Sequence, residues 1–334
     1  MHRSPDTFVS LATPHRTQQR IGIVVPCYNE EEILPDTFRQ LLHFLETVVT
    51  EGIAGSDSFI LCVDDGSRDT TWDLIRQQAA TSDHIRGIRL SRNSGHQQAL
   101  AAGLRTARNC DAVISIDADL QDDLSVVRDM LTAWRSGSQV VCGVRKSRHT
   151  DTVFKRRTAA MFYSFMHIMG VDLIPDHADF RLLDHDALQA LLEYRERNLF
   201  LRGLIPLIGF SVTTIYYDRL PRTAGETKYP LRRMLSLAVE GITSFSITPL
   251  RIIALSGLMI SGLSLLAIIF AIVRELTGHT VTGWSSIVSA IFFMGGVQML
   301  SLGIIGEYIG KIYLETKMRP GYHIRDSVNP PLQD

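Results

Sequence analysis

Two long stretches without a charged side chain limit what this chain can fold into more than any other feature. Residues 252–273 and 284–306 are apolar runs of 22 and 23 residues. Each is long enough to cross about 30 Å of hydrocarbon as a helix, which takes about 20 residues. Because only residues 274–283 separate the two runs, the sequence predicts an antiparallel pair of membrane-spanning helices whose outer ends share one side of the membrane.

Basic residues flank the outer ends of this predicted hairpin. They are Arg232, Arg233 and Arg251 before it, and Lys311, Lys317, Arg319 and Arg325 at or after the end of the second run. The connection carries Arg274 alone, so the positive-inside rule places both termini and the region before the hairpin in the cytoplasm. The first 20 residues contain no apolar signal segment. We therefore expect a multi-pass protein of the cytoplasmic (inner) membrane.

The region before the hairpin alternates short apolar runs with longer helical patterns. The pattern predicts strands at 21–25, 58–63, 87–90 and 112–116 and helices at 33–49, 70–80 and 97–107. Such alternation is typical of an α/β domain with a mostly parallel sheet, whose ligand crevice lies beyond the carboxyl ends of the strands. The expected organisation is a polar tail at 1–20, this domain at 21–230, an amphipathic juxtamembrane segment at 231–250, the hairpin at 251–315 and a cytoplasmic tail at 316–334.

Charge and cysteine content exclude some classes of protein. A net charge of −1 at pH 7 offers no basic surplus, so we expect no nucleic-acid partner. The four cysteines are scattered without CxxC spacing, so we expect them to be reduced and structural. They are Cys27, Cys62, Cys110 and Cys142.

The run 114–116 ends in Asp117 and Asp119, followed by Asp122 and Asp123. Two carboxylates at the end of a strand provide the hard oxygen ligands that Mg²⁺ or Mn²⁺ prefers. Such an ion keeps several waters and binds phosphate oxygens, so the pair is a candidate site for a nucleoside diphosphate. The alternative is a pair of solvated loop carboxylates. For Asp122 and Asp123 we expect a role as negative charge at a helix N-terminus.

Polar residues also follow the other predicted strands. After the strand at 58–63, Gly66 suits a turn with positive φ, and Asp69 or Thr70 suits a helix cap. Capping leaves Asp64 and Asp65 unused, so we interpret this pair as a site for the N–H group of a uracil base. Residues 91–96 fit either a turn with an asparagine cap or a part of the nucleotide site.

The segments at 25–32, 63–71, 90–100 and 117–123 (VPCYNEEE, VDDGSRDTT, LSRNSGHQQAL and DADLQDD) resemble the successive motifs of inverting glycosyltransferases with the GT-A fold. Within that class they are similar to the polyprenyl-phosphate branch, which includes dolichyl-phosphate mannose synthase and bacterial undecaprenyl-phosphate glucosyl and aminoarabinose transferases. Later matches lie at 179–184 and 222–229, and the bacterial relatives share a C-terminal two-span hairpin. The resemblance therefore covers nearly the whole chain.

This resemblance implies roles for individual residues. The donor nucleotide would contact Pro26, Tyr28, Asn29, Glu30, Asp64, Asp65, Asn93, Gly95, Asp117 and Ala118. The metal ion would be held by Asp117, Asp119 and Gln121. Catalysis would involve Asp119 and Asp179, the latter as a base or an orienting group.

The acceptor would be a lipid phosphate, which is already ionised at neutral pH and needs no strong base. Basic residues would hold it; the candidates are Arg145, Arg157, Arg181, Arg222 and Lys228. For the basic cluster at 155–157, adhesion to anionic lipid headgroups is an equal alternative. The segment 222–229 fits either a linker or a loop that closes over the lipid phosphate.

The expected function is the metal-dependent transfer of a sugar from a UDP-sugar to a polyprenyl (undecaprenyl) phosphate, with membrane association and, by resemblance, a homo-oligomer. A processive polysaccharide synthase is disfavoured because the chain lacks a Gln-x-x-Arg-Trp motif. A non-catalytic lipid-binding or flippase-partner subunit that retains the fold is the remaining alternative. The sequence does not select the sugar.

Overall fold

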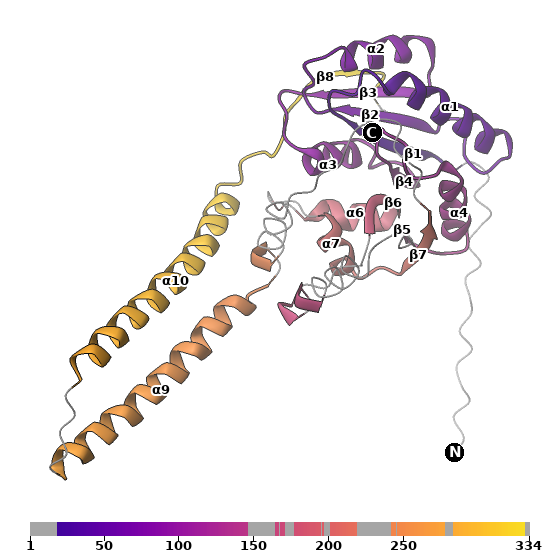
Figure 1. Ribbon diagram of the computed structural model, residues 1–334. Coiled ribbons are helices and arrows are strands. Elements are labelled where there is room, and N and C mark those ends of the chain that lie inside the picture. Colours follow the sequence, from indigo (N-terminus) through magenta and orange to yellow (C-terminus); the bar gives the residue numbers. More distant parts are fainter. Residues whose placement is uncertain are drawn as a thin grey trace, which may run out of the picture.

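The computed structural model describes residues 19–145, 164–166, 168–170, 177–194, 196, 201–218, 242–244, 246–277 and 283–330. One eight-stranded sheet organises the α/β domain, with the strand order β7-β5-β6-β4-β1-β2-β3-β8 (Figure 1). The strands are β1 (Ile21–Cys27), β2 (Phe59–Asp64), β3 (Ile85–Leu90), β4 (Ala112–Ser115), β5 (Val140–Arg145), β6 (His177–Asp184), β7 (Val212–Tyr217) and β8 (Ile324–Val328).

The centre of the sheet is parallel, as the alternating sequence pattern predicts. Strand β1 pairs in parallel with β2 and β4, and β2 pairs in parallel with β3. Strand β6 is antiparallel to both β4 and β5, while β7 runs parallel to β5. The carboxyl ends of β1, β2, β3 and β4 therefore meet at one edge of the sheet, where the ligand crevice is expected.

Helices cover both faces of the sheet, so the central strands are buried on both sides. Helices α1 (Leu34–Thr50), α2 (Thr71–Thr81) and α4 (Leu124–Arg135) pack on one face, and α3 (His96–Thr106), α6 (His185–Glu193) and α7 (Leu201–Leu207) pack on the other. Successive residues of β1 alternate between these two cores, with Ile23 and Val25 in one and Val24 in the other. This explains why the strand reads as a continuous apolar run.

The approach of α3 to the sheet requires a glycine. A Cβ atom at Gly103 would lie 2.3 Å from Cγ1 of Val24 and 2.9 Å from Cγ2 of Val63. Such distances are far below van der Waals contact, so a larger residue would push α3 off β1 and β2. The N-terminus of α3, where His96 stands, is thereby fixed relative to the strand ends.

The segment after the hairpin is not only a tail. Strand β8 pairs antiparallel with β3, from Gly87 opposite Val328 to Leu90 opposite Ile324. The Ser91 amide also donates to the His323 carbonyl at 2.9 Å. The sequence pattern does not predict this strand, because three of its five residues are polar, Arg325, Asp326 and Ser327. Such a composition is typical of an edge strand facing solvent.

Two long helices form the hairpin, α9 (Thr248–Leu276) and α10 (Trp284–Thr316), and they extend side by side away from the sheet (Figure 1). Within the residues that the structure describes, one helix, at Thr248–Leu266, is long and apolar enough to cross a membrane. Its side chains are exposed, among them Leu255, Leu258 and Leu263 at 62–72%. The prediction of two spans stays a prediction.

Candidate active site

The carboxylates Asp117 and Asp119 follow β4 in a tight turn. The Leu120 amide donates to the Asp117 carbonyl at 3.2 Å, and Leu120 has a positive φ of 42°. The hydroxyl of Thr37 on α1 donates to the Ala118 carbonyl at 2.7 Å. A non-glycine residue in the left-handed region costs free energy and persists only where its surroundings fix it. The turn that carries both carboxylates is therefore held rigidly at the edge of the sheet.

The surroundings of Asp117 favour a bound cation. Burial raises the pKa of Asp117; the charge of His96 opposes this, and the nearby carboxylates of Asp179, Asp122 and Asp119 raise it further. Accumulated negative charge of this kind is what a divalent ion neutralises, and carboxylate oxygens are the ligands that Mg²⁺ and Mn²⁺ prefer. The described residues contain no group of three or more His, Cys, Asp or Glu arranged to hold a metal. An ion here would complete its coordination with water and substrate oxygens.

Gln121 does not stand out as a third ligand. Its backbone amide donates to Asp119 Oδ1 at 3.4 Å, and the residue as a whole is only 4% exposed. Its placement supports the shape of the turn, and its role as a metal ligand stays a prediction.

Asp179, on β6, lies at the centre of a cluster of nitrogen donors. Its Oδ1 is 2.5 Å from Nη2 of Arg181 and 3.3 Å from Nε of Arg202. Its Oδ2 is 3.1 Å from Nη2 of Arg202 and 3.0 Å from Nε2 of Gln97. His96 Nε2 lies 3.3 Å from the same Oδ2. Four side chains from three different elements thus converge on one carboxylate.

These contacts lower the pKa of Asp179 and so determine how readily its carboxylate takes up a proton. Burial alone would raise the pKa of Asp179, but the contact with His96 and the charges of Arg181 and Arg202 hold it well below its usual range. A carboxylate with a low pKa is a weak base, because it binds a proton poorly. Of the two roles expected for Asp179, the geometry favours the orienting group.

His96 connects this cluster to the carboxylate pair. Its Nε2 is 3.8 Å from Oδ1 of Asp117 as well as 3.3 Å from Oδ2 of Asp179. Burial would lower the pKa of His96, but the contact with Asp179 and the charge of Asp117 raise it overall. The imidazole therefore bridges the candidate metal site and the cationic cluster.

Asp64 and Asp65 take no part in capping α2, as expected, but both bind other groups of the protein itself. Asp64 is fully buried, accepts the Ser67 amide at 3.0 Å and forms an ion pair with Arg89. Asp65 accepts the amides of Ser94 and Gly95 at 2.7 and 2.9 Å. Neither carboxylate is presented to a base in this arrangement, and their donor contacts stay a prediction.

The same contacts explain the motif at 91–96. Asp65 fixes the two residues before α3, and Gly95, with a φ of 93°, is the N-cap residue of that helix, not an asparagine. A Cβ atom at Gly66, whose φ is 67°, would lie 2.6 Å from the Arg92 carbonyl carbon. The loop after β2 and the loop before α3 are therefore packed directly on each other.

The loop after β1 is bound to the loop after β2 in the same way. The Asn29 amide donates to Ser67 Oγ at 2.9 Å, and Asn29 Oδ1 accepts the Arg68 amide at 2.9 Å. The Glu30 amide donates to Thr71 Oγ1. Pro26 is half-buried near the end of β1, Cys27 after it is buried, and Tyr28 beyond the strand is 39% exposed. The three strand-end loops expected to hold the nucleotide thus lie together.

Asp122 and Asp123, which we expected to act alike at a helix N-terminus, have different roles. Asp123 caps α4 by accepting the Ser125 amide at 2.8 Å, as expected. Asp122 is 2% exposed, accepts the Tyr217 hydroxyl at 2.5 Å and pairs with Arg145 Nη2 at 3.1 Å. For Asp122 the expectation was wrong, because two partners from β5 and β7 bury its charge.

The candidate acceptor-phosphate residues are only partly brought together. Arg145 is paired with Asp122, and Arg181 is 1% exposed beneath Asp179, so its placement does not fit direct contact with a lipid phosphate. Arg157, Arg222 and Lys228 lie outside the described residues.

Three residues of the cluster, His96, Gln97 and Arg202, have no individual role predicted from the sequence. His96 and Gln97 stand inside the motif at 90–100, so that motif was the available signal for both. Arg202 has no comparable signal, because its partner Asp179 is 23 positions away.

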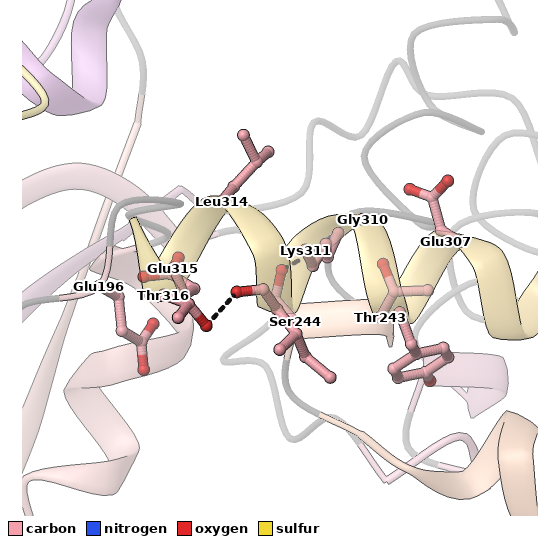
Figure 2. Close-up of a pocket in the computed structure, with 11 residues that line it drawn as sticks. Glu196, Thr243, Ser244, Glu307, Gly310, Lys311, Leu314, Glu315 and Thr316 are labelled. Atoms are coloured by element: carbon pink, nitrogen blue, oxygen red, sulfur yellow. Dashed lines mark hydrogen bonds between the residues drawn. The ribbon is translucent and has the colours of Figure 1, made fainter. Parts of the chain in front are cut away.

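A cavity of about 730 Å³ lies beside α10, where residues 243 and 244 approach that helix (Figure 2). Lys311 Nζ donates to Ser244 Oγ at 2.9 Å. The cavity is also lined by Glu196, Glu307 and Glu315, and burial together with the charge of Glu315 raises the pKa of Glu196. Among the described lining residues, three carboxylates stand against one lysine, which does not suit a phosphate group, and none of them belongs to the cluster at Asp179.

Together the mostly parallel sheet, the strand-end carboxylates and the hairpin define a glycosyltransferase with a GT-A-like fold. The chain belongs to glycosyltransferase family 2, whose model matches residues 22–192, and the GtrB C-terminal hairpin matches residues 248–312.

Related proteins match almost the full chain. The glycosyltransferase YkoT of Bacillus subtilis is 50% identical over 92% of both chains. A prophage bactoprenol glucosyl transferase homolog of Escherichia coli is 36% identical over 92% of this chain and 98% of its own. A bactoprenol glucosyl transferase of Shigella phage SfII is also 36% identical, with the same coverage. Among solved structures, glucosyl-3-phosphoglycerate synthase of Mycobacterium tuberculosis has a TM-score of 0.43 at 16% identity, covering 68% of this chain and 79% of its own.

Proposed function

We propose that this protein is a metal-dependent, inverting glycosyltransferase that moves a sugar from a UDP-sugar to a polyprenyl phosphate at the cytoplasmic face of the membrane. The product would be a lipid-phosphate-linked sugar for modification of cell-envelope glycans. Relatives named bactoprenol glucosyl transferases, which match 92% of the chain, support the lipid acceptor. The matching C-terminal hairpin supports membrane association.

One observation carries the proposal: a carboxylate pair and a cationic cluster meet at the same strand ends. His96 Nε2 lies 3.8 Å from Asp117 and 3.3 Å from Asp179, which in turn holds Arg202. Transfer between two phosphate-bearing substrates needs one group for the donor diphosphate and a separate group for the acceptor phosphate. A divalent ion on the carboxylates neutralises the donor diphosphate, and cations of the protein attract the acceptor phosphate.

On the donor side, Asp117 and Asp119 would hold Mg²⁺ or Mn²⁺. When bound, the ion would stabilise the charge of the departing UDP. The loops after β1 and β2 and before α3, which contain Tyr28, Asn29 and Asn93, would surround the nucleotide. Their mutual hydrogen bonds keep this cradle in shape before the donor binds.

On the acceptor side, no general base is required. The second pKa of a phosphate monoester is near 6, so the lipid phosphate already presents an ionised oxygen at neutral pH. Attack by this oxygen at the anomeric carbon breaks the bond to the diphosphate and inverts the configuration. Asp179 contributes by holding Arg202 and His96 in place.

The hairpin would position this chemistry at the membrane. We propose that α9 and α10 both span the bilayer and that the two termini lie in the cytoplasm, since basic residues flank the outer ends. The acceptor phosphate is then available at the height of the lipid headgroups, on the side where UDP-sugars are made.

Sugar transfer tests the proposal directly. Membranes containing the wild type are incubated with undecaprenyl phosphate, Mg²⁺ and a panel of radiolabelled UDP-sugars, and the lipid fraction is counted. We expect one sugar to be transferred, and we expect Asp119→Asn or excess chelator to abolish the transfer. Asp73→Asn, an exposed carboxylate of α2, is the matched control and should keep full activity. No transfer from any donor would favour a non-catalytic lipid-binding subunit.

A further inference from the structure

Arg202 is the more accessible of the two arginines in the Asp179 cluster. It lies on α7, and its side chain is 43% exposed, whereas the side chain of Arg181 is 1% exposed. Both arginines contact the same carboxylate, but only Arg202 can also meet a ligand from solvent. Arg202 is therefore the member of the pair that fits a substrate anion.

The orientation of Arg202 leaves several of its N–H donors available for such an anion. Its Nε and Nη2 face Asp179 Oδ1 and Oδ2 at 3.3 and 3.1 Å, so the side edge of the guanidinium is used. A guanidinium has five N–H donors in a fixed plane, and this contact takes two of them. The remaining edge, formed by Nη1 and Nη2, has the geometry that binds two phosphate oxygens at once.

The acceptor positions of the Asp179 carboxylate are all used by protein donors, so Asp179 does not bind the substrate itself. Five nitrogen contacts from four side chains surround its two oxygens. A carboxylate offers about four lone-pair positions. It therefore acts as a fixed anion between two arginines, and the three groups together keep one positive charge.

Gln97 holds the backbone next to Arg202. Its Nε2 donates to Asp179 at 3.0 Å, and its Oε1 accepts the amide of Leu201 at 3.2 Å. One carboxamide thus connects α3, β6 and the first residue of α7. A half-exposed arginine usually loses conformational entropy when it binds a ligand. Here Asp179 and Gln97 have already restricted it.

The location matches what the second phosphate needs. A single imidazole, that of His96, separates Asp179 from the candidate metal ligand Asp117. We propose that Arg202 binds the phosphate of the lipid acceptor, with Asp179 and Gln97 as positioning residues. This inference rests on the proposed function for the nature of the acceptor, and it assigns the contact to Arg202 in place of the buried Arg181.

A binding experiment tests this contact without requiring turnover. Full-length protein in detergent with Mg²⁺ and UDP is titrated calorimetrically with farnesyl phosphate, farnesol or inorganic phosphate. We expect Arg202→Met to weaken farnesyl phosphate binding at least about tenfold, since a charge-assisted bidentate contact is lost. The affinity for UDP should change less than about twofold, because the donor is held elsewhere.

Matched variants separate this role from a structural one. Arg128→Met is the control, because Arg128 is 45% exposed and paired with Glu51, far along the chain from the cluster. It should bind like the wild type. Arg202→Lys keeps the charge but not the fork, so it should recover part of the affinity and remain informative if Arg202→Met fails to fold. Gln97→Leu should raise the KM for the lipid phosphate more than it lowers kcat.

The outcomes distinguish the contact from the function. Equal farnesyl phosphate binding by the wild type and both Arg202 variants, or an equal loss of UDP affinity, would overturn the assignment. Inorganic phosphate binding as tightly as farnesyl phosphate would overturn the lipid acceptor. A wild type that binds farnesyl phosphate through Arg202 but transfers no sugar would support the contact and refute the proposed function.

Discussion

Replacing Asp179 with asparagine tests the central electrostatic feature of the site. The substitution keeps the shape of the side chain and removes its charge. Arg181 is 1% exposed, and its Nε and Nη1 have no hydrogen-bond partner among the described residues. Asp179 is the carboxylate that its Nη2 contacts, at 2.5 Å. Asp179→Asn therefore leaves a buried guanidinium without a counter-charge.

The expected loss of stability follows from burial. Removing one partner of a buried ion pair costs about 3–5 kcal/mol, whereas an exposed pair contributes about 0–1 kcal/mol. Arg202 is 43% exposed and can turn toward solvent, and the asparagine oxygen still accepts one hydrogen bond. Both effects place the expected loss of unfolding free energy at the lower end of the range for a buried pair, about 3 kcal/mol.

Urea unfolding of the α/β domain, followed by circular dichroism in detergent, measures this loss. Glu51→Gln is the control, because its pair with Arg128 has side chains 39% and 45% exposed; its cost should stay below about 1 kcal/mol. Asp179→Asn combined with Arg181→Met should recover at least about 1.5 kcal/mol, since no buried charge remains unpaired. A loss below about 1 kcal/mol for Asp179→Asn, or no recovery in the double variant, would refute the reasoning.

Three further predictions concern other parts of the chain. A cysteine at position 279 should react with an impermeant maleimide in intact cells and one at position 330 only after permeabilisation; labelling of 279 only after lysis would reverse the orientation. Burial raises the pKa of Cys110 to about 12 and of Cys142 to about 11, so at pH 8 fewer than about one thiol in a thousand is ionised, and mass spectrometry should find maleimide on either only after denaturation. Val328→Asp places a charge against the core under β8 and should cost about 1–2 kcal/mol in the same urea assay, whereas the exposed Arg325→Ala should cost nothing measurable.

Local patterns in the sequence were sufficient for much of the fold. The alternation of apolar runs and helical periods predicted β1, β2, β3 and β4 and the helices between them, with each boundary within about two residues of the observed one. Polar residues after each run marked the edge of the sheet where the loops meet. These features are local, because strand and helix periodicity and turn chemistry depend on neighbours in the chain.

Only the tertiary structure determined which polar side chains are hydrogen-bond or ion-pair partners. Gln97 and Asp179 are 82 positions apart, and Asp65 and Ser94 are 29 apart. Asp122 looked like a helix-terminal charge until β5 and β7 brought Arg145 and Tyr217 against it. The sequence gives the type of each ionisable side chain. Its pKa, its available hydrogen-bond donors and its access to a substrate depend on which groups from distant parts of the chain pack around it. For that reason Arg181 and Arg202, the same residue type against one carboxylate, become a buried counter-ion and an accessible cation.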